Sequence, residues 1–360
     1  MRAGHGFRVL TTDDVSGWNR AALATVRALA GSQYQPSVTV AGPVSLAASS
    51  RWCAEVVEVP KGGTPGYAQR LRERVAEGGY FALLPASDVA LIALRDPAAR
   101  LVDKASLAST VRDAGLQSLP GQVYPGLEEL RAQAAALDFP AVVKSVVKSG
   151  VENLQAVRVD SPSDVHELSA APGEVLVQPF LARPMRAISG VVWDDRFLAV
   201  CHQEYLRLWP SRAGVAAAAV TVDADPELEH AVLRLLRGHS GVFQVQLIDR
   251  FVLDVNPRVY GSMPLAVSAG ANLPLLACDA ALGKVPDAVT RSRPGMRYRW
   301  LEGDLRNAVA ELRRGDAGFS EVMRRVLPQR RTVYSVESLR DPRPTWTRVR
   351  AVASARGKSR

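Results

Sequence analysis

Cysteine is scarce in this chain: its 360 residues include three, Cys53, Cys201 and Cys278, which lie far apart. None belongs to a CxxC pair, and none has clustered histidines beside it. The sequence therefore predicts neither a disulfide framework nor a zinc site, and a reducing cytoplasm is the expected location.

Long apolar runs and the common nucleotide-binding motifs are also missing. No stretch reaches the roughly 18 apolar residues of a membrane span, so none is expected. The N-terminus leads directly into a predicted strand and Asp13-Asp14, which argues against a signal peptide. There is no Walker A motif and no GxGxxG motif, because Gly4-His5-Gly6 precedes a strand instead of following one. Any nucleotide site must be of another design.

Positive charge is in excess, but it is concentrated at one end. The net charge is +9, and from Pro328 onward nine lysines and arginines face only Glu337 and Asp341. The rest is near neutral, so nucleic-acid binding is not predicted. We expect the tail to be solvated or packed at the periphery, with contact between Trp346 and an anionic surface left open. A hydrophobic content of 47% with 22% charged residues is typical of a globular protein of two or three lobes.

The first hundred residues alternate between strand and helix patterns. Strands are expected at Phe7–Thr11, Ser37–Ala41, Glu55–Val59 and Tyr80–Pro85, with helices at Ala21–Ala30, Tyr67–Glu77 and Ala86–Leu94. This alternation predicts a parallel sheet covered on both faces. Asp13-Asp14 and Ser87-Asp88 follow strands, where ligands bind in such sheets, although both pairs could equally cap helices.

Two apolar runs later in the chain predict a β-hairpin. Val242–Ile248 and Phe251–Val255 flank the polar pair Asp249-Arg250, as strands flank a turn. Strand alternation places Gln244 and Gln246 on one face of the first strand.

The second strand carries Asp254 and Asn256, which share a face because they are two residues apart. Carboxylate and amide oxygens are ligands that suit Mg²⁺. Arg258 follows as a planar fork for phosphate or carboxylate. The alternative is a capped hairpin in which Asp254 and Asn256 only satisfy the backbone of the turn.

Asp254-Val255-Asn256-Pro257-Arg258, followed by Gly261-Ser262 and Ala269–Pro274, resembles the end of the ATP-grasp domain, and further matches run from about Arg8 to Gly283. The resemblance implies a fold of the α/β and α+β classes, in which an N-terminal parallel α/β pre-ATP-grasp domain precedes a two-lobed ATP-grasp domain. The implied boundaries are 1–100 for the first domain, 101–183 for the small lobe, 184–290 for the large lobe with the metal site, and 291–360 for a basic C-terminal extension.

The resemblance also implies an ATP site. Lys144 ends a predicted strand at Phe139–Lys144, and Lys104 lies in a helix predicted over Leu101–Gly115; both match lysines that contact phosphates. Ser145 and Lys148 would supply donors where the family has a glycine-rich loop, of which only Gly150 is present. The remaining implied contacts are Val177, Gln178, Phe180 and Leu181 around adenine, which an ordinary buried strand would also contain, and Arg207 as a basic contact.

The implied metal ligands are Asp254, Asn256 and Gln246. Gln246 stands where the family usually has a second carboxylate. A unit charge pair about 4 Å apart contributes about 4 kcal/mol at an effective dielectric of 20, so a neutral amide should weaken at least one Mg²⁺ site.

Taken with the resemblance, these residues predict an ATP- and Mg²⁺-dependent ligase. It would join a small carboxylate of the amino-acid type to an amine through an acyl phosphate, releasing ADP and phosphate, with Arg258 and Lys144 in catalytic roles. Small-molecule substrates are expected, with neither nucleic acid nor a membrane span, and a homodimer is left open. The main alternative is a non-catalytic nucleotide- or metabolite-binding module on the same fold, and a carboxylase-type or glycan-modifying ligase is also open.

Overall fold

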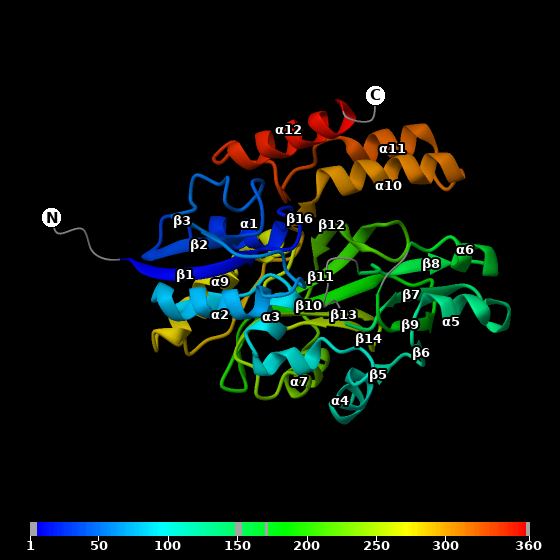
Figure 1. The fold of residues 1–360 in the computed structure, drawn as a ribbon, viewed down its shortest axis with the longest axis horizontal. Helices are drawn as coiled ribbons and strands as arrows, with labels where there is room; N and C mark the ends of the chain where they lie inside the picture. Colours follow the sequence, from blue (N-terminus) through cyan, green and yellow to red (C-terminus); the bar gives the residue numbers. More distant parts are fainter. Residues whose placement is uncertain (1–5, 148–152, 170–171, 358–360) are drawn as a thin grey trace.

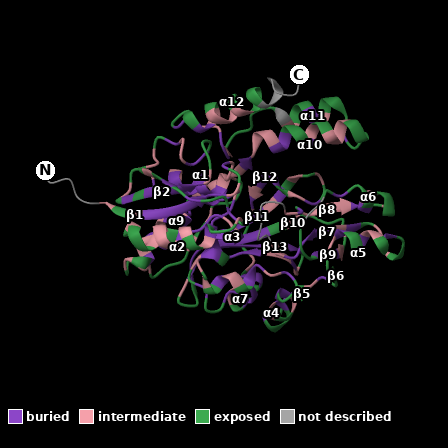
Figure 2. Ribbon diagram, viewed as in Figure 1, coloured by how far each residue is buried: buried purple, intermediate pink, exposed green. Residues whose placement is uncertain are grey.

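The computed structural model describes residues 6–147, 153–169 and 172–357, which form three β-sheets flanked by helices (Figure 1). Figure 2 shows the buried residues concentrated along the strands, whereas the C-terminal helices are largely exposed. Within these ranges, no helix combines the length and apolar character that crossing a membrane requires.

The first sheet is parallel, as the alternation of strands and helices predicted. Its order is β3 (Glu55–Glu58), β2 (Tyr34–Val40), β1 (Phe7–Asp13) and β4 (Ala82–Leu84), and its helices are α1 (Arg20–Ala28), α2 (Tyr67–Gly78) and α3 (Asp88–Ala93). Strands β1 and β2 are buried along most of their length, as expected for strands covered on both faces. One apolar core joins this sheet to the rest of the molecule, because Leu23 and Val26 of α1 belong to the same cluster as Val259 and Cys278.

The acidic and hydroxyl side chains at the ends of these strands mostly support local structure. Asp13 accepts hydrogen bonds from the Asn19 N–H at 3.1 Å and the Ser45 hydroxyl at 2.6 Å, and its burial raises its pKa to about 7. Asp14 accepts from the Tyr67 hydroxyl. The Ser87 hydroxyl accepts from the Ala90 N–H and so caps α3, which confirms the helix-cap alternative for this residue.

The helix predicted from Leu101 begins only at Leu107. A 3-10 turn, η1 (Pro97–Leu101), is followed by a bend, and α4 then spans Leu107–Asp113. The Asp103 carboxylate accepts from the Ala105 and Ser106 N–H groups, and this local bonding competes with helix formation. Lys104 therefore lies in a turn.

The second sheet, called the small sheet here, is antiparallel with the order β6-β9-β7-β8. Its strands are β6 (Gln122–Tyr124), β7 (Ala141–Ser145), β8 (Val157–Val159) and β9 (Val175–Pro179), and it is covered by α5 (Leu127–Ala132), η2 (Ala134–Ala136) and α6 (Pro162–His166).

The third sheet, called the large sheet here, has the order β17-β16-β12-β11-β10-β13-β14-β5, with β15 paired to β11. Its strands are β5 (Gln117–Ser118), β10 (Met185–Trp193), β11 (Arg196–Trp209), β12 (Val215–Thr221), β13 (Gly241–Ile248), β14 (Phe251–Asn256), β15 (Thr290–Arg291), β16 (Arg297–Arg299) and β17 (Thr332–Tyr334). Its associated helices are α7 (Pro226–Leu235), α8 (Pro264–Ser268) and α9 (Leu273–Ala281).

The predicted hairpin is confirmed as β13 and β14. Asp249 adopts the positive φ of +52° that its tight turn requires. The register pairs Gln244 with Asn256 and Gln246 with Asp254. These four polar side chains therefore form two cross-strand pairs on neighbouring strands.

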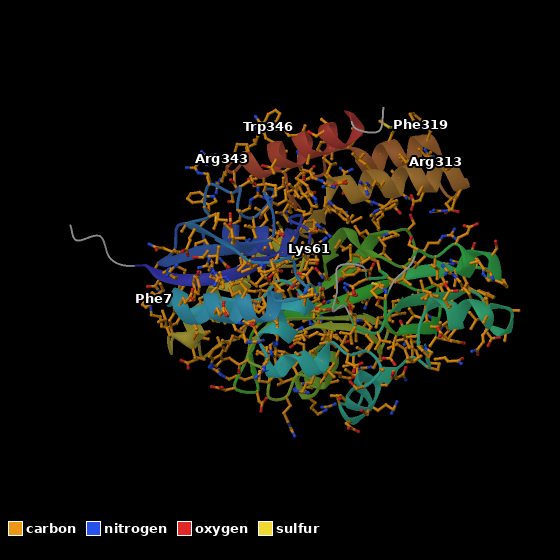
Figure 3. All side chains as sticks on the ribbon, in the orientation of Figure 1. Phe7, Lys61, Arg313, Phe319, Arg343 and Trp346 are labelled. Carbon is orange, nitrogen blue, oxygen red and sulfur yellow. The ribbon has the colours of Figure 1, made fainter. Side chains whose placement is uncertain are left out.

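The C-terminal region adds three helices, α10 (Leu301–Arg314), α11 (Phe319–Val326) and α12 (Arg343–Gly357), at the top of the view in Figures 1 and 3. The segment before α12 is connected to the first domain by hydrogen bonds to the buried Asp341. Its carboxylate accepts from Arg27 Nε at 3.0 Å, the Ser50 hydroxyl at 2.7 Å and the Arg51 N–H at 3.0 Å. The basic tail thus packs on the body, while Trp346 stays 60% exposed.

Candidate functional site

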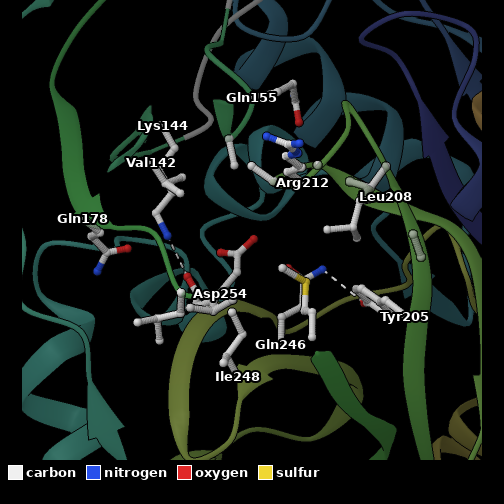
Figure 4. Close-up of a pocket in the computed structure, with 18 of the residues that line it drawn as sticks. Val142, Lys144, Gln155, Gln178, Tyr205, Leu208, Arg212, Gln246, Ile248 and Asp254 are labelled. Atoms are coloured by element: carbon white, nitrogen blue, oxygen red, sulfur yellow. Dashed lines mark hydrogen bonds between the residues drawn. The ribbon is translucent and has the colours of Figure 1, made fainter. Parts of the chain in front are cut away.

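A cavity of about 580 Å³ opens between the small sheet and the large sheet (Figure 4). Strands β7 and β9 contribute one wall and the β13–β14 hairpin another. The predicted site residues that line it are Lys104, Lys144, Gln178, Phe180, Leu181, Gln246, Asp254, Asn256 and Arg258. Residues more than 150 positions apart in the sequence are therefore brought to one place.

Two buried lysines provide positive charge on this cavity. Lys144, near the end of β7, donates from Nζ to the Leu253 carbonyl at 2.9 Å and so connects the two sheets. Lys104 donates to the Val146 carbonyl at 3.3 Å, and its Nζ lies 3.5 Å from Asp254 Oδ1. Such compact ammonium groups, held in place by backbone carbonyls, suit the binding of phosphate oxygens.

Asp254 points its carboxylate into the cavity, whereas its cross-strand partner Gln246 is neutral (Figure 4). Gln246 Nε2 donates to the Tyr205 hydroxyl at 3.4 Å. Burial raises the pKa of Tyr205, so this hydroxyl stays protonated at neutral pH. Among the described residues, no group of three or more histidine, cysteine or acidic side chains could hold a metal by itself.

The amides beside Asp254 form a connected hydrogen-bond network. Gln244 Oε1 accepts from both Gln246 Nε2 and Asn256 Nδ2 at 3.4 Å. Gln244 Nε2 donates in turn to the Ser262 hydroxyl at 3.2 Å. This network holds the side chains in place without adding negative charge, so Asp254 supplies the carboxylate that the hairpin directs into the cavity.

Arg258 is held by three partners. Its Nη2 donates to Asn256 Oδ1 at 2.8 Å, Nη1 donates to the Val259 carbonyl at 3.0 Å, and Nε donates to Asp88 Oδ1 at 2.5 Å. Asp88 is 4% exposed and begins α3 of the first domain. In the sequence, Asp88 stands out only by its place after a strand, and the structure shows that this residue positions Arg258.

The end of β9 forms an apolar slot on the same cavity. Phe180 and Leu181 line it, and the Arg158 guanidinium lies 4.2 Å from the centre of the Phe180 ring. Gln178 also lines it, and Nε2 of Gln178 donates to the Leu119 carbonyl at 3.4 Å. The wall is completed by apolar residues that the sequence analysis did not single out, namely Val142, Met185, Ile248 and Leu253.

Three predicted site residues that the structure describes do not line the cavity, and a fourth, Lys148, lies outside the described residues. Val177 packs in the core of the small sheet, and the Ser145 hydroxyl accepts from the Leu154 N–H at 2.9 Å. Arg207 pairs with Asp304, which does not line the cavity either. Arg212 and Arg20, which the sequence analysis did not identify, line the cavity instead.

Comparisons with known proteins agree with this architecture. A sequence model of the family described as "ATP-grasp in the biosynthetic pathway with Ter operon" matches residues 212–304, which include the β13–β14 hairpin. No curated protein sequence matches the chain.

Solved structures match most of the chain at low sequence identity. An L-amino acid ligase from Bacillus licheniformis is 14% identical, with a TM-score of 0.53 and coverage of 81% of this chain and 79% of the ligase. An ADP complex of N5-carboxyaminoimidazole ribonucleotide synthetase is 12% identical, with a TM-score of 0.60 and coverage of 86% and 85%.

A third match is the biotin carboxylase domain of 2-oxoglutarate carboxylase from Hydrogenobacter thermophilus, in complex with MgADP, ADP and bicarbonate. It is 14% identical, with a TM-score of 0.55 and coverage of 81% of this chain and 73% of that one. The resemblance seen in the sequence is therefore confirmed: this chain has the ATP-grasp fold, and its residues 212–304 match an ATP-grasp family.

Proposed function

We propose that this protein is an ATP-dependent ligase that joins a small carboxylate to an amine and releases ADP and phosphate. One observation carries the proposal: Lys104, Lys144, Asp254, Asn256 and Arg258 converge on one cavity that also has an apolar slot. Phosphoryl transfer to a carboxylate requires positively charged side chains that bind phosphate, a carboxylate–amide pair that holds a metal cation, and a guanidinium that contacts the transferred group. A cytoplasmic location and a homodimer stay predictions.

The proposed reaction has two steps. A substrate carboxylate oxygen attacks the γ-phosphorus of ATP, forming an acyl phosphate as the bond to the β-phosphate oxygen breaks and ADP leaves. The amine nitrogen then attacks the acyl carbon, the carbon–oxygen bond to phosphate breaks, and the amine loses a proton as phosphate departs. Lys144 and Lys104 hold the phosphates, and Arg258 neutralises the transferring group.

The donor set suits one Mg²⁺ better than two. Asp254 would hold it, together with the lone pair of Asn256 Oδ1 that does not accept from Arg258 Nη2, and phosphate oxygens would complete its shell. The ion would supply charge neutralisation and alignment of the phosphates. Gln246 offers only a neutral oxygen where a second ion would need a carboxylate.

Nucleotide product analysis tests the proposal. The protein is incubated with Mg-ATP and a pool of amino acids and small carboxylates, and ADP, AMP and phosphate are quantified against the same mixture without the pool. ADP and phosphate that depend on the pool are expected, and dividing the pool then identifies both substrates. AMP and pyrophosphate as products would exclude an acyl-phosphate mechanism.

The second candidate is a non-catalytic nucleotide-binding module, which the neutral Gln246 opposite Asp254 favours. A Gln246→Glu variant separates the two. The added carboxylate should raise the apparent affinity for Mg²⁺ by about tenfold or more, because it faces Asp254 in a partly buried site. For a working enzyme adapted to glutamine, we expect turnover to change little or to fall.

The measurement is ADP release across a Mg²⁺ titration, with Gln117→Glu on the exposed β5 strand as the matched control. If ADP forms only in the Gln246→Glu variant, the native chain is the binding module and the ligase proposal is wrong.

A further inference from the structure

Four arginines line the cavity in the described part of the chain, and three of them are paired with aspartates. Arg258 pairs with Asp88, Arg212 with Asp316, and Arg183 with Asp249. The fourth, Arg20, forms no ion pair with any carboxylate among the described residues. Arg20 thus brings to the cavity a positive charge that forms no ion pair with a described aspartate or glutamate; Glu302, whose pKa this charge helps to lower, pairs instead with Arg348 and Arg306.

Arg20 is nevertheless held in a defined position. It is the first residue of α1, and Nη1 donates to the Tyr298 hydroxyl at 2.6 Å. Its guanidinium carbon lies 3.9 Å from the centre of the Trp300 ring, which is a cation–π contact. The rest of its five N–H donors have no acceptor among the described residues.

The backbone of the motif that contains Arg258 comes close to this guanidinium. A Cβ placed on Gly261 would lie 3.4 Å from Cζ and Nη2 of Arg20. The Tyr298 hydroxyl, which accepts from Arg20, donates to the Gly261 carbonyl at 3.1 Å. Arg20 is therefore fixed beside the segment that follows Asn256 and Arg258, at the part of the cavity lined by Tyr260 and Ser262.

We propose that Arg20 binds an oxyanion, a carboxylate or a phosphate, that one substrate carries in addition to its reacting group. A guanidinium that is oriented on one side by an aromatic ring and a hydroxyl, and unpaired on the other, matches the planar recognition of such groups. The proposal deepens the ligase function and depends on it: the substrate class becomes an acid or amine with a second, unreacted anionic group. The first domain would thereby select the substrate.

Three substrate pools test this. They share their reacting acids and amines but differ in the additional group, which is a carboxylate, a phosphate or a neutral amide. The wild-type protein should form ADP with one of the anionic pools and far less with the neutral one.

The Arg20→Gln variant should raise KM for the active anionic substrate by about 10- to 100-fold, as expected for a lost charged hydrogen bond, and should leave KM for ATP unchanged. The variant and the wild type should process the neutral substrates equally. Arg20→Lys retains the positive charge but not the planar guanidinium, and it should give an intermediate KM. If Arg20→Gln does not fold, Arg20→Lys provides the test.

The matched control is Arg51→Gln, which removes another arginine stacked on a tryptophan of the first domain, 4.7 Å from the Trp52 ring and away from the cavity. An unchanged KM in Arg20→Gln, or equal use of neutral and anionic pools by the wild type, would overturn the role of Arg20 and leave the ligase function intact. Absence of ADP from every pool with the wild type would overturn the ligase function, and the inference with it.

Discussion

An Asp254→Asn variant is expected to form ADP about a thousandfold more slowly than the wild type while keeping its fold. Asparagine has nearly the same shape, so the change removes the charge and little else. Asp254 is the carboxylate that β14 directs into the cavity and the proposed anionic ligand of Mg²⁺, and its cross-strand partner Gln246 is neutral. Loss of a charge interaction worth about 4 kcal/mol corresponds to about three powers of ten in rate.

The measurement is ADP release at saturating substrates and Mg²⁺, together with the thermal unfolding midpoint. Asp249→Asn is the control, because Asp249 lies at the turn of the same hairpin and pairs with the exposed Arg183. A rate within tenfold of the wild type would show that Asp254 does not hold the metal. A lowered rate together with a lowered unfolding midpoint would instead indicate a loss of stability, because the variant removes the carboxylate charge that lies 3.5 Å from the buried Lys104 ammonium.

A Lys144→Met variant is expected to lower ADP formation by about 100- to 1000-fold and to weaken ATP binding. Methionine retains much of the length of the buried side chain but removes the ammonium, which would donate to phosphate oxygens. The change also removes the 2.9 Å hydrogen bond to the Leu253 carbonyl, which joins β7 to β14 across the cavity.

ATP binding by titration calorimetry and ADP release together check this prediction. Lys61→Met serves as the control, because Lys61 is an exposed lysine of the first domain (Figure 3). If the Lys144→Met variant binds ATP with wild-type affinity and turns over within threefold of the wild type, Lys144 is not a phosphate ligand.

Local patterns explain which parts of the site the sequence could predict. Alternation of apolar and polar residues, with a polar pair between two runs, was sufficient to place Asp254 and Gln246 in neighbouring strands and to specify which faces they share. Lys104 and Lys144 were identified by the motifs around them. The predicted helix at Lys104 is a turn in the structure, because the Asp103 carboxylate accepts from the Ala105 N–H.

Arg207 shows where alternation fails. The pairing of β11 with β12 is irregular on both sides of Arg207, with register shifts between Tyr205 and Arg207 and between Arg207 and Leu208. Each register shift changes which side chains of β11 face the cavity. Strand alternation alone therefore could not show that Arg207 does not line it. Tyr205 and Leu208 line the cavity, whereas Arg207 pairs with Asp304 outside it.

Local sequence could not reveal the role of Asp88 beside Arg258, and it gave no sign of Arg20. Their partners lie 170 and 278 residues later in the chain, at Arg258 and Tyr298. Only the packing of the first domain against the large sheet, through the apolar core that includes Leu23 and Val259, brings these residues to the cavity.

The hydrogen bonds between Asp341 and the first domain have a consequence for the order in which the chain folds during synthesis. Arg27 lies in α1, but the carboxylate that it binds follows 314 residues later in the chain and is therefore synthesised after it. Until then, Arg27, Ser50 and the Arg51 N–H lack the acceptor that joins them. The parallel-sheet domain therefore gains these three hydrogen bonds only after Asp341 has been synthesised, and translation that stalls before Asp341 leaves the three donors without this acceptor.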